Sequence, residues 1–421
     1  MLIRQIATGC LALVLAGCAG LRETPSASSA PAPAPPSTVV LVSIDALRAD
    51  VVGTGAMPTL DAIAAAGMHA RWMNPSYPTL TFPNHYSLVT GLRPDHHGVI
   101  HNRMHDADLG SFVSKEQSAR DGRWWSGGEP LWATLERAGQ RTAILFWPGS
   151  TAEVHGERPS QWRTFDKTMG VHARVRQALD WLDPVSSTGQ ALPAPQRPRL
   201  VAVYFDQYDV AAHRCGAHCP DALAAQRDID AGLAELRAGI AALSAERRID
   251  LVVVSDHGMA DVARGDIRYV DDVVPADALD ILDDGPLLLA ATRAGREAEA
   301  MRLVGRHDHY QCWRREDLPP AWHYGSNPRI PAIVCQADEG WLLQTRAQPA
   351  FAQAIKGEHG YAPESPSMRA AFVAEGPDFR RGVEVAPFDN VDVYPLLARL
   401  LGVEPLANDG DIAPLLPALR D

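Results

Sequence analysis

The sequence is short of positive charge. It contains 39 lysine and arginine residues against 51 aspartate and glutamate residues, which gives a formal net charge of −12 at pH 7. A protein that coats a nucleic-acid backbone needs clustered positive charge, so this balance argues against a nucleic-acid-binding protein. It leaves open a small anionic substrate held by metal ions.

Several motifs of common enzyme classes are also missing. The chain has no Walker phosphate loop, no Gly-x-Ser-x-Gly elbow, no His-Glu-x-x-His pair and no internal repeat. The apolar stretch from Ile6 to Leu15 is too short to span a bilayer as a helix. Its charged start and short apolar middle are instead typical of a secretory signal, which we expect at residues 1–17.

The end of this stretch predicts a lipid anchor. Leu15-Ala16-Gly17-Cys18 resembles the bacterial lipobox, in which the cysteine is lipidated and becomes the mature N-terminus. Ala19 follows, rather than the Asp that often retains such proteins at the inner membrane. We therefore expect a lipoprotein of the bacterial cell envelope, attached through Cys18 to the outer membrane and facing the periplasm. A buried structural role for Cys18 is the alternative.

The segment after the anchor is rich in Ala, Pro and Ser and cannot bury a core, so residues 18–37 are predicted to be a tether. We expect residues 38–421 to form one domain, which would carry any catalytic site. Four of the six cysteines lie in it, in a compartment that permits disulfides. Of the three pairings, Cys215 with Cys219 and Cys312 with Cys335 closes the shortest loops. A zinc site built on Cys215 and Cys219 is a weaker alternative, since no second closely spaced cysteine pair exists.

Short runs of β-branched residues that end in acids predict the fold class. Val39 to Ile44 precedes Asp45, Leu200 to Phe205 precedes Asp209, and Leu251 to Val254 precedes Asp256. Such runs suit strands buried on both faces, and helical patterns lie between them, so we expect an α/β fold with a parallel sheet. Ligands of open α/β sheets gather beyond the carboxyl ends of the strands, where these acids would meet.

Seven residues in well-marked contexts form the candidate site. Carboxylate and imidazole groups in these numbers suit two adjacent zinc ions, with a threonine as nucleophile. Taken singly, each has a structural interpretation, as a helix cap, a surface ion pair or a loop histidine. The seven are Asp45, Thr81, Asp209, His213, Asp256, His257 and His359.

Together these contexts resemble the nucleotide pyrophosphatase/phosphodiesterase family of the alkaline phosphatase superfamily. The resemblance rests on Thr81-Phe82-Pro83-Asn84-His85, on Asp256-His257-Gly258-Met259, and on shorter matches from Thr90 to Asn408. It implies an alkaline-phosphatase-like fold, with a central, mostly parallel sheet flanked by helices and with lid or insert segments. Residues 260–350 could supply the lid.

The resemblance also implies roles for individual residues. One zinc would be held by Asp209, His213 and His359, and the other by Asp45, Asp256, His257 and the oxygen of Thr81. Asn102 falls where the family places a donor to a phosphoryl oxygen, and Tyr204 matches a position that contacts the substrate base. The implied reaction is the cleavage of nucleotide 5′-phosphodiester or pyrophosphate bonds through a phosphothreonine, which releases a nucleoside 5′-monophosphate.

Two departures from the family pattern bear on the substrate. Leu80 stands where many members have a polar residue, and Arg214-Cys215-Gly216 follows His213 where Gly-Pro is common. The alternatives are a phospholipid or choline phosphodiesterase, a phosphomonoesterase of the same superfamily, and a surface lipoprotein that keeps the fold only as a scaffold. A sulfatase would need Cys-x-Pro-x-Arg, which Thr81 to His85 does not supply.

Overall fold

The computed structural model describes residues 37–114, 116–185, 189–244, 247–347 and 354–420. The predicted signal peptide, the Cys18 anchor and all of the tether except Ser37 therefore lie outside the described residues. Within them, none of the helices has the length and apolar character needed to cross a membrane.

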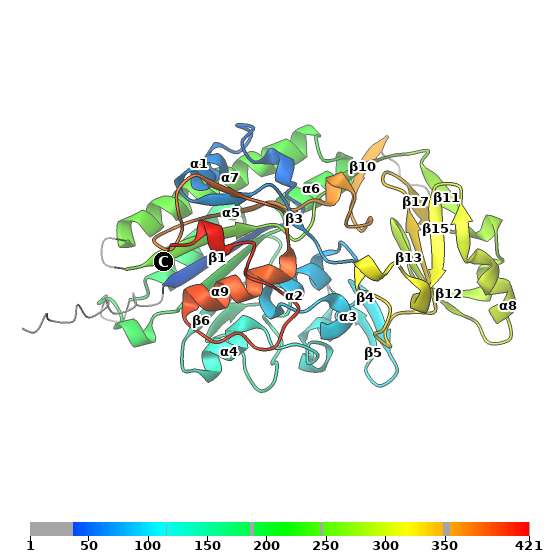
Figure 1. Cartoon of the computed structure of the whole chain (residues 1–421), viewed down its shortest axis with the longest axis horizontal. Coiled ribbons are helices and arrows are strands. Elements are labelled where there is room, and N and C mark those ends of the chain that lie inside the picture. The colour runs from blue at the N-terminus through cyan, green and yellow to red at the C-terminus, as the bar shows by residue number, and fades with distance from the viewer. Residues whose placement is uncertain (1–36, 115, 186–188, 245–246, 348–353, 421) are drawn as a thin grey trace, which may run out of the picture. The chain divides into compact units, whose positions relative to one another are not determined.

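An eight-stranded sheet forms the centre of the domain (Figure 1). Five neighbouring strands, in the order β9, β1, β8, β6, β7, are parallel, and β19 alone runs against the others. This confirms the mostly parallel sheet. In sheet order the strands are β20 (Val383–Val385), β2 (Met68–Ala70), β19 (Phe372–Glu375), β9 (Ile249–Val254), β1 (Thr38–Ile44), β8 (Leu200–Phe205), β6 (Thr142–Leu145) and β7 (Gln161–Arg163).

Helices cover both faces of this sheet, and each face has its own core (Figure 1). Side chains of a strand alternate between faces, so Val39 and Leu41 enter one core while Val40 and Val42 enter the other. Burial on both sides is why β1 has an uninterrupted apolar sequence. One face carries α1 (Pro58–Ala66), α5 (Val171–Leu182) and α7 (Pro220–Leu243), and the other α2 (Thr81–Thr90), α4 (Leu131–Arg137) and α9 (Val393–Leu401).

A second, antiparallel sheet of five strands occupies most of residues 260–350 (Figure 1). The disulfide between Cys312 and Cys335 joins two residues that face each other across β15 and β16. Together with the disulfide between Cys215 and Cys219, it confirms the predicted pairing. In sheet order the strands are β12 (Leu279–Asp283), β13 (Leu287–Thr292), β16 (Ile333–Ala337), β15 (Tyr310–Arg314) and β14 (Gly305–His307).

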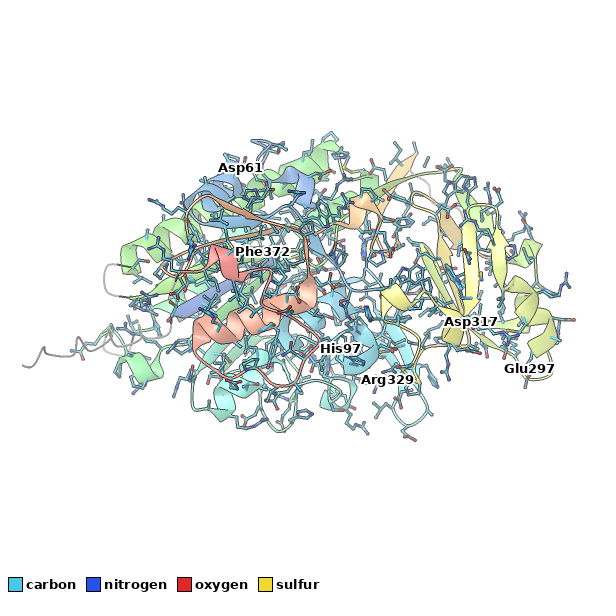
Figure 2. All side chains as sticks on the ribbon, viewed as in Figure 1. Asp61, His97, Glu297, Asp317, Arg329 and Phe372 are labelled. Atoms are coloured by element: carbon cyan, nitrogen blue, oxygen red, sulfur yellow. A yellow bond between two sulfur atoms is a disulfide. The ribbon has the colours of Figure 1, made fainter. Side chains whose placement is uncertain are left out.

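Arg329 attaches the loops of this second sheet to the α2 side of the domain. Its guanidinium pairs with Asp106 at 2.8 Å and donates to the carbonyl of Gly98 at 2.7 Å, and it lies 4.9 Å from the ring of Trp124. Figure 2 shows Arg329 close to His97 at this junction, whereas Glu297 lies at the outer end of the second sheet. The second sheet is thus held by specific polar contacts as well as by packing.

A short ladder connects the second sheet to the end of the first sheet where the predicted ligands lie. β10 (Ala260–Ala263) pairs antiparallel with β18 (Ile355–Glu358), with Ala260 opposite Glu358. β10 begins three residues after His257, and β18 ends one residue before His359. The ladder therefore brings two predicted ligands together although they are distant in the sequence.

Candidate metal centre

Three predicted acids converge at one edge of the main sheet, as expected from the strand ends. β1, β8 and β9 are adjacent and parallel, so their carboxyl ends share an edge. Asp45 directly follows β1, Asp256 follows β9, and Asp209 lies in the first turn of α6 (Gln207–Cys215), the helix after β8. All three side chains are buried.

Six of the seven predicted residues form two compact groups. In each group, one ligand atom per residue lies within 4.8 Å of the others, a spacing that would let one ion contact all three. The groups are Asp209 with His213 and His359, and Asp45 with Asp256 and His257. They adjoin each other, because the rings of His257 and His359 stack with centroids 3.7 Å apart.

The three histidines are held in the same way. Each Nδ1 donates to a backbone carbonyl, which fixes the ring and turns Nε2 toward the carboxylates, the arrangement expected of metal-binding histidines. The acceptors are Gly357 for His213 (2.9 Å), Gly258 for His257 (2.9 Å) and Thr79 for His359 (3.0 Å).

The carboxylates present unsatisfied oxygens to these nitrogens. Oδ1 of Asp45, Oδ1 of Asp209 and Oδ2 of Asp256 are buried and have no hydrogen-bond partner within the described part of the chain. They lie 3.4 Å from His257 Nε2, 3.3 Å from His213 Nε2 and 3.0 Å from His257 Nε2, respectively. Buried oxygens without partners are costly, and a cation would satisfy them. The residues therefore fit two divalent metal ions.

The pKa values show how strongly this site attracts positive charge. Burial, with Asp256 and Asp209 nearby, raises the pKa of Asp45 well above its usual range. Burial alone would raise the pKa of Asp209, but the neighbouring His213 lowers it to about 2. Burial would lower the pKa of His213, but Asp209 raises it to about 9. In the metal-free protein, protons supply the charge that metal ions would otherwise supply.

Thr81 lies where a nucleophile would be needed. It is the first residue of α2, and its Oγ1 lies 3.2 Å from His257 Nε2. The next residue, Phe82, donates its N–H to Oδ1 of Asn102 at 2.9 Å. Asn102 is thereby held beside Thr81 with its amide nitrogen as the available donor.

His85 is a site residue to which the sequence analysis assigned no role. Its ring is fully buried, and Nδ1 lies 2.8 Å from the carbonyl of Thr81 and 3.2 Å from Oδ2 of Asp256. Its Nε2 lies 2.8 Å from the hydroxyl of Ser43. Residues four apart on a helix share a face, so the spacing of Thr81 and His85 was the signal that could have revealed this contact.

Tyr204 lies at the site, but its hydroxyl faces a carboxylate. The hydroxyl donates to Oδ2 of Asp45, and the side chain is buried. Phe165, whose ring centroid is 6.4 Å from that of Tyr204, is 46% exposed and offers an accessible aromatic face. Phe165 was not among the residues predicted from the sequence, and the base contact assigned to Tyr204 stays a prediction.

The two departures from the family pattern lie near the first group. Leu80 is buried and approaches Gly360, the residue after His359. Cys215 ends α6 two residues after His213, and its disulfide to Cys219 joins α6 to the start of α7. The cysteine pair is thus structural, and the alternative of a cysteine zinc site is wrong.

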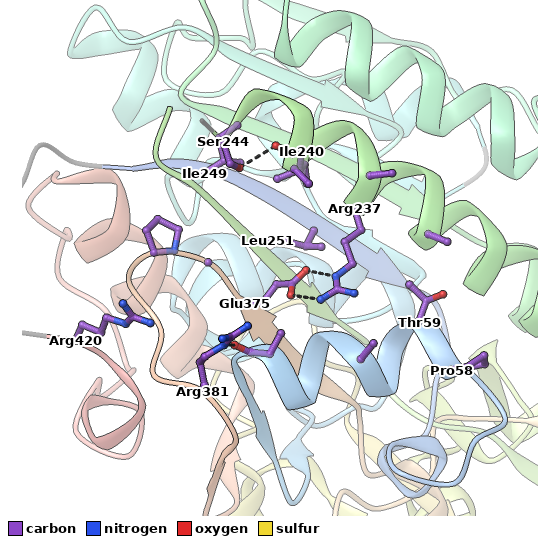
Figure 3. Close-up of a pocket in the computed structure, with 17 residues that line it drawn as sticks. Pro58, Thr59, Arg237, Ile240, Ser244, Ile249, Leu251, Glu375, Arg381 and Arg420 are labelled. Carbon is purple, nitrogen blue, oxygen red and sulfur yellow. Dashed lines mark hydrogen bonds and ion pairs between the residues drawn. The ribbon is translucent and has the colours of Figure 1, made fainter. Parts of the chain in front are cut away.

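A separate cavity of about 790 Å³ lies between α1, α7 and the ends of β9 and β19 (Figure 3). None of the seven predicted residues lines it. Its acidic residue, Glu375, is paired with Arg237 through two contacts of 2.6 and 2.8 Å. This cavity is distinct from the metal centre.

Comparisons with known proteins point to one family. A family model described as type I phosphodiesterase / nucleotide pyrophosphatase matches residues 39–362, a range that includes all seven predicted residues. An uncharacterized pyrophosphatase/phosphodiesterase of Schizosaccharomyces pombe is 31% identical over 400 residues, which cover 91% of this chain and 81% of that protein. The rat ectonucleotide pyrophosphatase/phosphodiesterase family member 3 is 32% identical over 387 residues, but the match spans only 43% of its length.

Solved structures agree with the sequence relatives. Human ectonucleotide pyrophosphatase/phosphodiesterase 5 superposes with a TM-score of 0.84 at 28% identity, covering 91% of this chain and all of that chain. The murine protein, in an inactive threonine-to-alanine form in complex with AMP, gives a TM-score of 0.83 at 27% identity with the same coverage.

The charge balance of the centre predicts a pH-dependent stability for the metal-free protein. The folded-state pKa of His213, about 9, lies above the 6.5 of an unperturbed histidine. Its pairing with Asp209 therefore contributes stability below pH 6.5 and loses it as the pH rises through 9. We expect the free energy of unfolding, measured with urea in the presence of a chelator, to fall between pH 6.5 and 9.

Two controls isolate the centre from other groups, such as Asp250, whose pKa burial raises to about 8. Asp209→Asn removes the partner of His213 and should flatten part of the slope. In the wild type, added zinc should reverse the fall in the free energy of unfolding, because metal binding displaces the protons. A metal-free stability that is constant or rises over this range would contradict the charge assignment.

Proposed function

The chain belongs to the type I phosphodiesterase / nucleotide pyrophosphatase family, and from that membership we propose that it hydrolyses nucleotide 5′-phosphodiester or pyrophosphate bonds and releases nucleoside 5′-monophosphates. The observation that carries the proposal is the meeting of two carboxylate and histidine groups beside the hydroxyl of Thr81. A murine relative in complex with AMP supports a nucleotide as the substrate.

We assign two zinc ions to the two groups, because oxygen and imidazole donors in sets of three suit zinc and leave a position open for chemistry. Asp209, His213 and His359 would hold one ion, and Asp45, Asp256, His257 and Thr81 the other. When bound, such ions lower the pKa of a coordinated hydroxyl or water and offset negative charge on phosphoryl and leaving oxygens.

The reaction would proceed in two displacements at phosphorus. In the first, the Thr81 hydroxyl loses its proton to solvent and Oγ1 forms a bond to phosphorus while the bond to the leaving oxygen breaks, so the leaving group departs with the electron pair. In the second, water attacks the phosphothreonine, the bond from phosphorus to Oγ1 breaks, and Thr81 regains its proton. The product retains the phosphate on the nucleoside.

Two features would stabilise the substrate phosphoryl group. The amide nitrogen of Asn102 can donate to one of its oxygens, since the amide oxygen is engaged by the N–H of Phe82. Thr81 begins a helix of ten residues, and the N-terminus of a helix favours a negative charge. Both act on the group that gains charge during the reaction.

Phe165 would provide the stacking surface for the nucleotide base. Its side chain is exposed, and its ring packs against Phe146, with centroids 5.3 Å apart. It also lies near Tyr204, whose hydroxyl contacts Asp45 of the centre. Base stacking on an aromatic side chain contributes about 1–3 kcal/mol. A choline head group would need an aromatic cage instead.

The substrate class can be tested by comparing three substrates. They are the nitrophenyl ester of thymidine 5′-monophosphate (the thymidine ester), methyl nitrophenyl phosphate, and simple nitrophenyl phosphate. We expect the highest kcat/KM for the thymidine ester, because it is a diester with a base. Phe165→Ala should lower kcat/KM for that ester roughly 5- to 150-fold and leave kcat/KM for methyl nitrophenyl phosphate nearly unchanged.

Preference for simple nitrophenyl phosphate would instead identify a phosphomonoesterase. Cleavage of nitrophenyl phosphorylcholine in preference to the thymidine ester would favour the choline phosphodiesterase. If a zinc-loaded protein cleaves none of these esters, the nucleotide proposal is wrong and the scaffold alternative gains support.

Thr81→Ala should abolish turnover, by on the order of 10³-fold or more, and leave the zinc content unchanged, because three other ligands remain at that position. Thr90→Ala, at the opposite end of α2, removes a comparable hydroxyl and is the control. Activity and zinc content are both measured on purified protein. Near-normal turnover in Thr81→Ala would reject Thr81 as the nucleophile.

We also propose that the protein is a lipoprotein anchored to the outer membrane through Cys18, as the lipobox-like sequence indicates. Cys18→Ser should move the protein from the membrane fraction to the soluble fraction, whereas Cys10→Ser, within the leader, should not. Retention of the Cys18→Ser protein in membranes would refute the anchor.

A further inference from the structure

Tyr204 reaches a metal-binding carboxylate from the neighbouring strand. It is the fifth residue of β8 and lies opposite Ser43 of β1, two residues before Asp45. Its hydroxyl donates a hydrogen bond to Oδ2 of Asp45, and both side chains are buried. The contact therefore joins two adjacent strands at their carboxyl ends.

This hydrogen bond makes the two oxygens of Asp45 unequal. Oδ2 is occupied by Tyr204, whereas Oδ1 has no hydrogen-bond partner among the residues that the structure describes and lies 3.4 Å from Nε2 of His257. The oxygens of Asp256 are unequal as well, since its Oδ1 accepts from the N–H of Ala46 at 3.2 Å, whereas its Oδ2 faces Nε2 of His257 at 3.0 Å and Nδ1 of His85 at 3.2 Å. In Asp45 the protein thus engages one oxygen through a neutral hydroxyl and leaves the other for a cation.

The ring of Tyr204 has little freedom to move. It meets the ring of His85 edge to face, with centroids 5.0 Å apart and an interplanar angle of 88°. His85 is itself fixed by the hydroxyl of Ser43 and the carbonyl of Thr81, both at 2.8 Å. A hydroxyl held so firmly sets the orientation of the carboxylate before any ligand arrives.

From these contacts we infer that Tyr204 is a positioning residue, which holds Asp45 so that a single oxygen faces the metal in the Asp45, Asp256 and His257 group. The inference rests on the proposed two-metal centre. Asp209, in the other group, is contacted by His213 and His359 instead. Tyr204 therefore governs the affinity of one of the two metal positions.

Tyr204→Phe separates this role from the predicted base contact, because the variant keeps the ring and loses only the hydroxyl. Zinc affinity is measured on the metal-depleted full-length protein by competition with a chromophoric chelator. We expect the affinity of Tyr204→Phe to be about 10- to 100-fold weaker than that of the wild type at one of the two positions. The other position should be unchanged. With methyl nitrophenyl phosphate, kcat should fall at limiting zinc and recover when zinc is in excess.

The control is Tyr394→Phe, in α9. It removes a hydroxyl that accepts a hydrogen bond from the N–H of Leu406 at 3.0 Å. Its zinc affinities should equal those of the wild type. Thermal unfolding of both variants without metal verifies that they are folded.

A double-mutant cycle with Asp45 tests whether Tyr204 acts through that carboxylate. In an Asp45→Ala background, Tyr204→Phe should have no further effect on zinc affinity. An equal effect in both backgrounds would overturn the inference, as would a Tyr204→Phe protein with two wild-type zinc affinities.

A higher KM for the thymidine ester, with zinc binding intact, would also overturn the inference and favour the base contact. The metal readout is independent of turnover. A wild-type protein that binds zinc but cleaves no ester would refute the proposed function, and the effect of Tyr204→Phe on zinc affinity would still decide the role of Tyr204.

Discussion

Repulsion among three buried carboxylates is the constraint on which the catalytic end of this domain depends. Asp45, Asp209 and Asp256 lie at the ends of three adjacent parallel strands and are all buried. Burying a charge costs several kcal/mol per ion unless it is compensated. The three histidines and the capacity for metal ions follow from this requirement, because only added positive charge makes such an arrangement stable.

The backbone around the site is shaped to hold the histidines. Each ring is fixed through a carbonyl, and glycines beside the ligands let chain segments approach closely. A Cβ atom on Gly258 would lie 1.9 Å from the carbonyl oxygen of Ser367, and one on Gly357 would lie 2.6 Å from that of Ala212. Both glycines also supply carbonyls to the ligating rings. Rigid packing thus determines where the imidazoles lie.

Strand-end reasoning predicted much of this arrangement from the sequence. The apolar runs before Asp45 and Asp256 indicated parallel strands, and parallel strands bring their carboxyl ends to one edge. The grouping of His359 with Asp209 and His213 came from family resemblance alone, since no local pattern places a residue so distant in the sequence. The ladder between β10 and β18 explains it.

Contacts across strands were beyond sequence reasoning. The hydroxyl of Tyr204 reaches Asp45 because β8 and β1 pair in a particular register, and nothing within either segment specifies that register. His85 could have been found from its helical spacing to Thr81, but its contact with Asp256 depends on how α2 packs against β9. The five-stranded sheet was likewise expected only as an insert of undefined structure.

The β10 and β18 ladder has a consequence for how such a domain can diversify. The chain leaves for the second sheet just after Asp256 and His257 and returns just before His359. The leaving strand, β10, and the returning strand, β18, are paired in an antiparallel ladder. The segment between β10 and β18 is therefore an insertion whose two ends are held together by the ladder. The length and the surface of this insertion can change while the ladder keeps both of its ends in place. Access of a substrate to the centre can therefore change without moving the metal-binding residues.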